Sequence, residues 1–141
     1  MQTLISIIIA LIIFGVLVLI HEFGHFIVAK KCGVVINEFS VGMGPRIFSR
    51  VAKSGTRYSL KLLPLGGSCA MLGEDEDNEE EGSFNSKSMP KKMAIVFAGP
   101  FFNFILAFVL ALIVIGAKGA DVSYVTDIDK NSAAYEAGLR V

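Results

Sequence analysis

Residues 4–29 read LISIIIALIIFGVLVLIHEFGHFIVA, an apolar run that only Ser6 and Gly15 interrupt before it reaches His21. A helix over these residues would be about 39 Å long, which is enough to cross a hydrocarbon layer of about 30 Å. Lys30 and Lys31 follow at its end. The run therefore predicts a transmembrane helix. An N-terminal secretory signal is the alternative, but Met1-Gln2-Thr3 carries no charge and no small-residue cleavage site follows.

The segment His21-Glu22-Phe23-Gly24-His25 lies inside this predicted span. Two histidines four residues apart project from one face of a helix and can hold one zinc ion, and the adjacent Glu22 can reach a water bound to it. Counted back from Lys30, His25 lies about 8 Å and His21 about 14 Å inside the membrane boundary. Ionisable groups at this depth cost several kcal/mol unless they are partnered, which favours a functional site over a chance spacing in a packed helix.

Composition supports the membrane class. Of the 141 residues, 53% are hydrophobic, a larger share than most soluble domains have. The formal net charge is zero. No basic patch indicates nucleic acid. Cys32 and Cys69 form neither a C-x-x-C pair nor a disulfide framework, and we expect free thiols.

A second apolar segment, Met93–Ala117, is also long enough to span and ends at Lys118. No basic residue precedes the first span, whereas ten lie between the two segments, at Lys30, Lys31, Arg46, Arg50, Lys53, Arg57, Lys61, Lys87, Lys91 and Lys92. Because positive loops stay in the cytoplasm, we expect a multi-pass protein of the cell inner (plasma) membrane with loop 30–92 cytoplasmic and the N-terminus outside.

Between Gly33 and Leu72 the apolar residues alternate, which is typical of strands. Lys53-Ser54-Gly55-Thr56 is a turn signal, so we expect a hairpin over 47–63 that Pro64 and Gly66-Gly67 end. Such a sheet edge could accept an extended substrate as an added strand. It could equally be a small structural hairpin that caps the cytoplasmic side of the site.

Gly99-Pro100 and Asn103 interrupt the second apolar segment. Gly99-Pro100 would break the helical ladder locally, or only kink the helix. Asn103 has two interpretations. It could join two helices by a hydrogen bond, or it could face the histidines and donate to a substrate carbonyl or its developing oxyanion.

The remaining segments carry less chemistry. Glu74–Glu81 is an acidic run of the kind found in solvated linkers, and it lacks the spacing of a calcium loop. Residues 121–141 predict a strand at 124–128 and a short helix at 132–138. They are too few to bury a core and resemble the start of a soluble domain.

Taken together, His21–His25, Gly66-Gly67, and Gly99-Pro100 with Asn103 resemble the bacterial form of the site-two protease family of intramembrane zinc metalloproteases, in its N-terminal part. The resemblance implies Zn²⁺ as cofactor, the lipid bilayer as environment and transmembrane protein substrates, with no nucleic acid. Such enzymes cut transmembrane helices of regulatory proteins or leftover signal peptides. It also implies that Asn103 belongs to the site.

The resemblance divides the chain into five parts. We expect a first transmembrane helix with the zinc motif (1–32), a cytoplasmic membrane-associated β region (33–73), an acidic linker with a basic membrane entry (74–92), a second transmembrane helix (93–118) and the start of an incomplete PDZ domain (119–141).

Two departures from the family pattern stand out. Ser68-Cys69-Ala70 replaces the usual aromatic and basic pair. The family also takes its third zinc ligand, an aspartate in a Leu-Asp-Gly motif, from a later helix that this chain does not contain. Cys32 lies about 10 Å along the helix from His25, too far to share the metal. Cys69 or Glu38 could replace the aspartate only if folding happened to bring one of them to the site.

Two hypotheses follow. In the first, the chain belongs to an intramembrane zinc metalloendopeptidase acting in regulated intramembrane proteolysis. His21 and His25 are then metal ligands, Glu22 is the catalytic base and Asn103 binds substrate or oxyanion. In the second, the chain is a catalytically inactive fragment or membrane binding module that lacks the third ligand.

Overall fold

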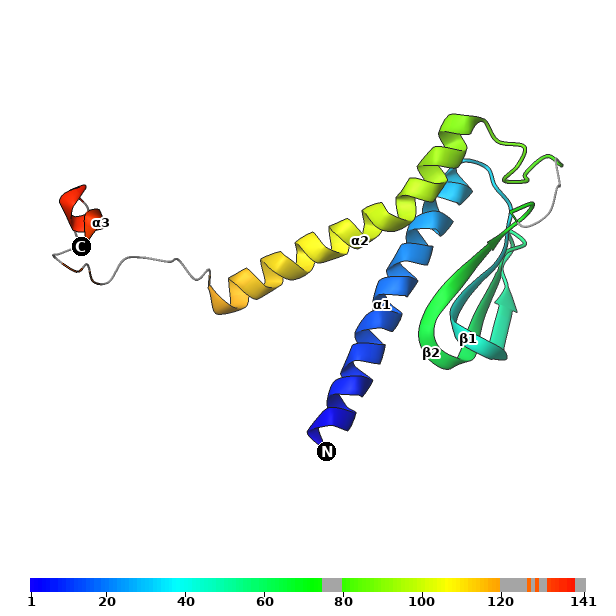
Figure 1. Ribbon diagram of the computed structural model, residues 1–141. Coiled ribbons are helices and arrows are strands. Elements are labelled where there is room, and N and C mark those ends of the chain that lie inside the picture. Colours follow the sequence, from blue (N-terminus) through cyan, green and yellow to red (C-terminus); the bar gives the residue numbers. More distant parts are fainter. Residues whose placement is uncertain (75–79, 120–126, 128, 130–131, 139–141) are drawn as a thin grey trace. The chain divides into compact units, whose positions relative to one another are not determined.

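The computed structural model describes residues 1–74, 80–119, 127, 129 and 132–138. Its elements in chain order are α1 (Gln2–Lys31), β1 (Ile36–Val51), β2 (Arg57–Met71), α2 (Met89–Lys118) and α3 (Ala133–Glu136) (Figure 1). The chain forms two compact units, Met1–Val109 and Leu110–Val141. Every residue of the candidate site lies in the first unit.

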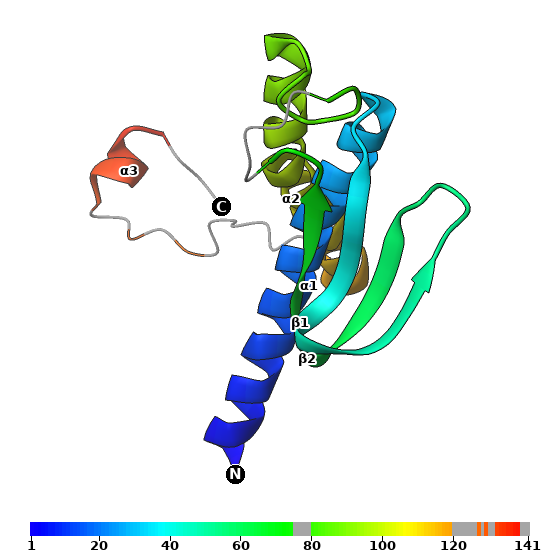
Figure 2. The same ribbon diagram turned by 90° about the vertical axis from the view of Figure 1, so that its right-hand side faces the viewer.

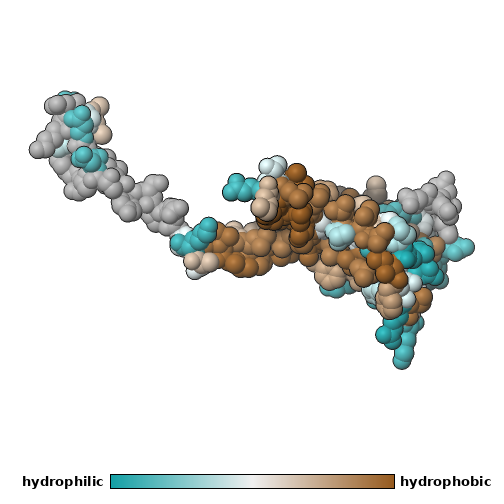
Figure 3. Space-filling view, turned by 90° about the horizontal axis from the view of Figure 1, so that it is seen from below, coloured by the Kyte–Doolittle hydropathy of each residue, from teal (hydrophilic) through white to brown (hydrophobic). Residues whose placement is uncertain are grey.

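α1 and α2 are each 30 residues long and apolar enough to cross a membrane. Their apolar side chains are largely exposed, and Figure 3 shows an almost continuous hydrophobic surface over these helices. Such a surface is stable against lipid tails and unfavourable in water. The expected pair of long apolar helices with a β-hairpin between them is confirmed.

α2 runs without interruption through Pro100, the proline inside it. The expected local interruption therefore does not end the helix, and Figure 1 shows that α2 bends partway along its length. A proline removes one helical hydrogen bond and crowds the preceding turn, which bends a helix whose other bonds persist. α2 also begins four residues before the expected Met93, because the Ser88 carbonyl accepts from the amides of Lys91 and Lys92.

β1 and β2 form one sheet in which both strands bend back on themselves. Residues 36–41 pair antiparallel with 67–71 on one side and run in the same direction as 57–60 on the other, and residues 46–51 pair antiparallel with 57–61. The expected turn is present, since Ala52 N–H donates to the Thr56 carbonyl and Gly55 has φ +84°.

The prediction that Pro64 and Gly66-Gly67 end the hairpin is wrong, because β2 continues to Met71. The ladder has no pair at residues 64–66, so the missing N–H of Pro64 breaks no strand bond there. Gly66 has φ +72°, a conformation that glycine adopts without strain and that allows the strand to bend.

The bend of β2 lies directly against the middle of α1 (Figures 1 and 2). A Cβ added to Gly66 would lie 2.7 Å from Val18 Cγ1, and one added to the buried Gly15 would lie 3.0 Å from the Pro64 carbonyl oxygen. Gly15 is six residues before His21, or about 9 Å further along the helix. The sheet therefore runs beside α1 on both sides of the histidine motif along the helix axis.

A hydrophobic core joins the C-terminal half of α1, the sheet and the start of α2. Its buried members are Phe26, Ala29, Val34, Ile36, Cys69, Met71 and Ile95. Phe26 and Phe39 connect helix and sheet with ring centroids 4.9 Å apart. Because side chains from all three parts interdigitate here, the core fixes the position of the His21–His25 turn against β2 and α2.

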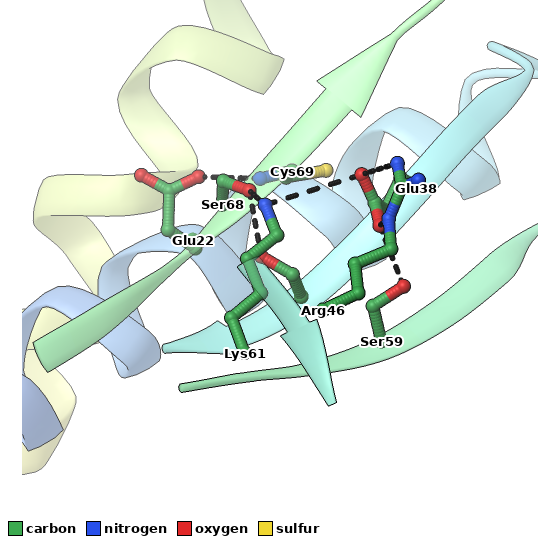
Figure 4. A network of polar contacts seen from close by, with 8 residues as sticks. Glu22, Glu38, Arg46, Ser59, Lys61, Ser68 and Cys69 are labelled. Atoms are coloured by element: carbon green, nitrogen blue, oxygen red, sulfur yellow. Dashed lines mark hydrogen bonds and ion pairs between the residues drawn. The ribbon is translucent and has the colours of Figure 1, made fainter. Parts of the chain in front are cut away.

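A polar network crosses the sheet around Glu38, whose side chain is 14% exposed (Figure 4). Arg46 binds it through two nitrogens, at 2.7 Å and 3.0 Å, and Ser59 Oγ donates at 2.5 Å. The hydrogen bond from Arg46 lowers the pKa of Glu38 to about 2. The carboxylate of Glu38 therefore binds Arg46 and Ser59 within the sheet and is not placed at the histidines.

This network predicts a specific acid sensitivity. Because the pKa of Glu38 is lower in the folded chain than its ordinary value of 4.5, the contribution of Glu38 to stability is complete above about pH 4.5 and is lost as pH falls towards 2. Glu38→Gln should flatten the pH dependence of the unfolding free energy in that window, measured by denaturant titration in detergent. Arg46→Gln should have the same effect, and parallel curves for wild type and Glu38→Gln would contradict the assignment.

Candidate metal centre

His21 and His25 lie on one face of α1, one turn apart. Their ring centroids are 4.8 Å apart and their planes meet at 77°. Both side chains are half-buried, although their helix is otherwise exposed over much of its length. The two imidazoles are close enough to bind one ion together.

The face of α2 that meets the histidines consists of Ile95, Gly99 and Asn103, which are spaced four residues apart. His25 Nδ1 lies 2.8 Å from the Ile95 carbonyl oxygen. A carbonyl only accepts hydrogen bonds, so the proton of neutral His25 is on Nδ1 and the lone pair is on Nε2. Metal-binding histidines are commonly oriented in this way by a second partner.

Both histidine rings meet Gly99 of α2. A Cβ added to Gly99 would lie 2.5 Å from His25 Nε2 and 2.6 Å from His21 Nε2. Both nitrogens therefore approach the same point on the α2 backbone, where any side chain would collide with them. Imidazole nitrogens are donors that zinc prefers, so two that converge in this way fit a zinc ion.

The helices approach closely enough to create this arrangement because a second glycine faces α2. A Cβ added to Gly24 would lie 2.5 Å from the Ala98 carbonyl oxygen and 3.1 Å from Phe102 Cβ. Small residues at a helix crossing allow the backbones to approach. Gly24 therefore sets the separation at which Gly99 meets the histidines.

Asn103 lies beside His21, in a position that fits both interpretations of the sequence, because its hydrogen bond also joins the two helices. Its Nδ2 is 3.3 Å from His21 Nδ1, and its Oδ1 is buried with no hydrogen-bond partner within the described part of the chain. A cavity of about 380 Å³ opens here, lined by His21, Pro100, Asn103, Phe104 and Ala107. Polar groups of both helices thus face an apolar cavity next to the proposed metal position.

Glu22 is held by the sheet. Its Oε2 accepts a hydrogen bond of 3.0 Å from the Cys69 amide, which lies on the edge segment 67–71 of β2 (Figure 4). The carboxylate is half-buried. The edge of the sheet therefore lies directly beside the residue that would act as the base.

The described residues contain no group of three or more His, Cys, Asp or Glu arranged to hold a metal. Cys32 and Cys69 are free cysteines. Burial raises the pKa of the Cys69 thiol to about 12. Within the described ranges, His21 and His25 are the two residues that could hold the metal.

Sequence reasoning missed Gly99 and the Ile95 carbonyl. It interpreted Gly99 as part of a local helix interruption and of a family motif, but not as a contact of the histidines. A usable signal was present, because residues 95, 99 and 103 repeat the four-residue spacing of His21 and His25 on a second apolar helix. A backbone carbonyl has no sequence signature, so the partner of His25 could not be read from residue types.

Comparison with known proteins agrees with this geometry. Residues 9–137 match the family described as peptidase family M50. This chain belongs to peptidase family M50. The predicted membership in the site-two protease family is confirmed. As a member of a membrane-protease family with two helices of sufficient length, the chain is a membrane protein.

Three relatives carry the name "putative zinc metalloprotease". The one from Clostridium acetobutylicum is 43% identical over 135 residues, covering 96% of this chain and 40% of the relative. Those from Vibrio cholerae and Campylobacter jejuni are each 41% identical and cover 92% of this chain, but 30% and 36% of their own lengths. The chain thus spans well under half of each relative. Zinc, the expected cofactor, is the metal in all three names.

The contact of both rings with Gly99 predicts the effect of one methyl group. Gly99→Ala places a carbon 2.5 Å from His25 Nε2 and 2.6 Å from His21 Nε2, and overpacking of this kind costs about 1–3 kcal/mol, equivalent to a loss of about 10–100-fold in zinc affinity. Competition with a chelator on the full-length protein would measure it. Gly116→Ala is the matched control, because no atom lies within 4 Å of a Cβ there. Unchanged zinc binding by Gly99→Ala would refute the assignment.

Proposed function

We propose that this chain forms the N-terminal part of an intramembrane zinc metalloendopeptidase that cleaves transmembrane segments of membrane proteins. The convergence of the Nε2 atoms of His21 and His25 at Gly99 carries this proposal. Glu22 lies between them in sequence and reaches the edge of the sheet. The names of the relatives support zinc as the metal.

The chemistry follows from the roles of these residues. His21 and His25 would hold a zinc ion through Nε2. Zinc held there would supply Lewis-acid polarisation of the scissile carbonyl and a lowered pKa of the attacking water. Glu22 accepts the proton that the attacking water loses and transfers it to the leaving amine as the peptide bond breaks. The apolar surroundings strengthen each of these electrostatic interactions.

The edge of the sheet could bind a substrate in an extended conformation. The amide of Cys69 on segment 67–71 points away from β1 and towards Glu22. A substrate segment that adds as a strand along this edge would place a peptide bond next to Glu22, with backbone hydrogen bonds supplying affinity without reading sequence. A transmembrane helix would have to unwind locally to pair in this way.

Several further parts of the proposal rest on the sequence pattern. A third ligand, an aspartate from a later helix, would complete the three protein ligands of a catalytic zinc site. The lysines and arginines of loop 30–92 support a cytoplasmic loop and an outside N-terminus in the plasma membrane. Residues 119–141 would begin a PDZ domain. Within them, α3 begins after its N-cap residue, Ser132. The expected strand at 124–128 lies mostly outside the described residues.

One observation favours a second function. Because the described ranges provide only two metal ligands, the chain by itself could be an inactive fragment or membrane binding module. Metal analysis of the purified 141-residue chain separates the two functions. Stoichiometric, tightly held zinc would contradict an empty two-ligand site.

Glu22→Gln tests the proposed enzyme directly. The amide cannot accept the proton of the attacking water, and general-base catalysis contributes about 10²–10⁴-fold to rates. Cleavage of a transmembrane substrate by the full-length protein in proteoliposomes should fall by that factor while zinc content is retained. Glu81→Gln, an exposed carboxylate outside the site, is the control and should cleave normally. Normal cleavage by Glu22→Gln would exclude the mechanism.

A further inference from the structure

Each of the two histidines of α1 has a polar contact with α2. The face formed by residues 95, 99 and 103 runs opposite His21 and His25, with Ile95 at His25, Asn103 at His21 and Gly99 between them. The Ile95 carbonyl already fixes the proton of His25 on Nδ1. A two-histidine site needs the same protonation on the other ring, because Nε2 of His21 converges with Nε2 of His25 at Gly99.

His21 can provide its Nε2 lone pair only if Nδ1 carries the proton. In the orientation observed, the amino group of Asn103 faces Nδ1 at 3.3 Å, and two N–H groups cannot hydrogen bond to each other. The oxygen of the same amide is buried with no partner within the described ranges. A half-turn of the amide exchanges oxygen and nitrogen at nearly the same volume and breaks no hydrogen bond of Oδ1.

We propose that Asn103 is a positioning residue whose side-chain oxygen accepts a hydrogen bond from His21 Nδ1, so that Nε2 of His21 is free to bind the metal. The inference rests on the proposed function, since it assigns a role within the same centre. α2 then orients both ligands of α1, using a backbone carbonyl for one and a side-chain amide for the other. Such second partners typically change metal affinity 10–100-fold.

This role differs from donation to a substrate oxyanion. The positioning role needs an acceptor at residue 103, whereas oxyanion stabilisation needs a donor. Asn103→Asp keeps an acceptor oxygen and removes both N–H groups. Asn103→Leu removes both functions at similar volume. The two variants therefore separate the roles through zinc affinity, which is measured without substrate.

The test measures zinc affinity of the full-length protein in detergent by chelator competition. Asn103→Leu should bind zinc 10–100-fold more weakly than wild type, and Asn103→Asp should recover most of that loss. Nitrogen-15 spectra of labelled histidine should show His21 protonated at Nδ1 in the zinc-loaded wild type. Ile105→Leu, a volume-conserving change at an exposed position of the same helix, is the control and should bind normally.

Each outcome decides the matter. Wild-type zinc affinity in Asn103→Leu would overturn the inference, as would equal losses in the Leu and Asp variants when both remain helical by circular dichroism. Protonation of His21 at Nε2 in the loaded protein would also overturn it. His21→Ala and His25→Ala distinguish this failure from failure of the proposed function, because unchanged zinc binding in those variants would remove the metal centre itself.

Discussion

Polar side chains inside an apolar helix must find their partners on neighbouring protein segments, because lipid offers none. The rest of the candidate site depends on this constraint. His21, Glu22 and His25 are three such groups in succession along α1. Ile95 and Asn103 of α2 provide polar atoms for the two histidines, and the Cys69 amide of β2 holds Glu22. The site is thus assembled from three segments that are distant in the sequence.

Close backbone approach makes these short contacts possible. Gly24 allows α2 to cross at a distance that a side chain would prevent, and Gly66 allows β2 to pack on Val18. The hydrophobic core around Phe26 and Ile95 then holds the three segments together. Packing therefore places the polar groups, and the polar groups in turn orient one another. Neither Pro100 nor the bend of α2 disrupts this arrangement, since the helix continues past both.

The long apolar helices and the hairpin turn could be predicted from the sequence. A run such as 4–29 admits few structures, because only a helix satisfies its backbone within a membrane. The motif spacing placed His21 and His25 on one face, and Gly55 marked the hairpin turn. The family could be predicted from the motifs at His21–His25, Gly66-Gly67 and Gly99-Pro100. Asn103 was expected near the histidines as one of two alternatives, and it lies next to His21 in the structure.

What could not be predicted involves contacts between backbones. Nothing in residue types shows that residues 36–41 pair on both sides, or that β2 continues beyond Pro64 to bring the Cys69 amide to Glu22. The contact of Gly99 with the histidines could not be predicted, because residue types do not show which side chains lie against a glycine. The Ile95 carbonyl could not be predicted either, because a backbone group has no sequence signature.

In the proposed centre, metal binding and helix pairing are thermodynamically linked, because both helices contribute to it. α1 provides both imidazoles, while α2 provides Gly99, where their Nε2 atoms converge, and the Ile95 carbonyl. An ion that binds only the paired state stabilises it by an amount that grows with the logarithm of free metal concentration. The linkage is reciprocal, so a lipid or substrate that separates α1 from α2 would lower the affinity for the ion. A change in packing at the Gly24–Ala98 crossing would then change the affinity of the proposed centre for its metal.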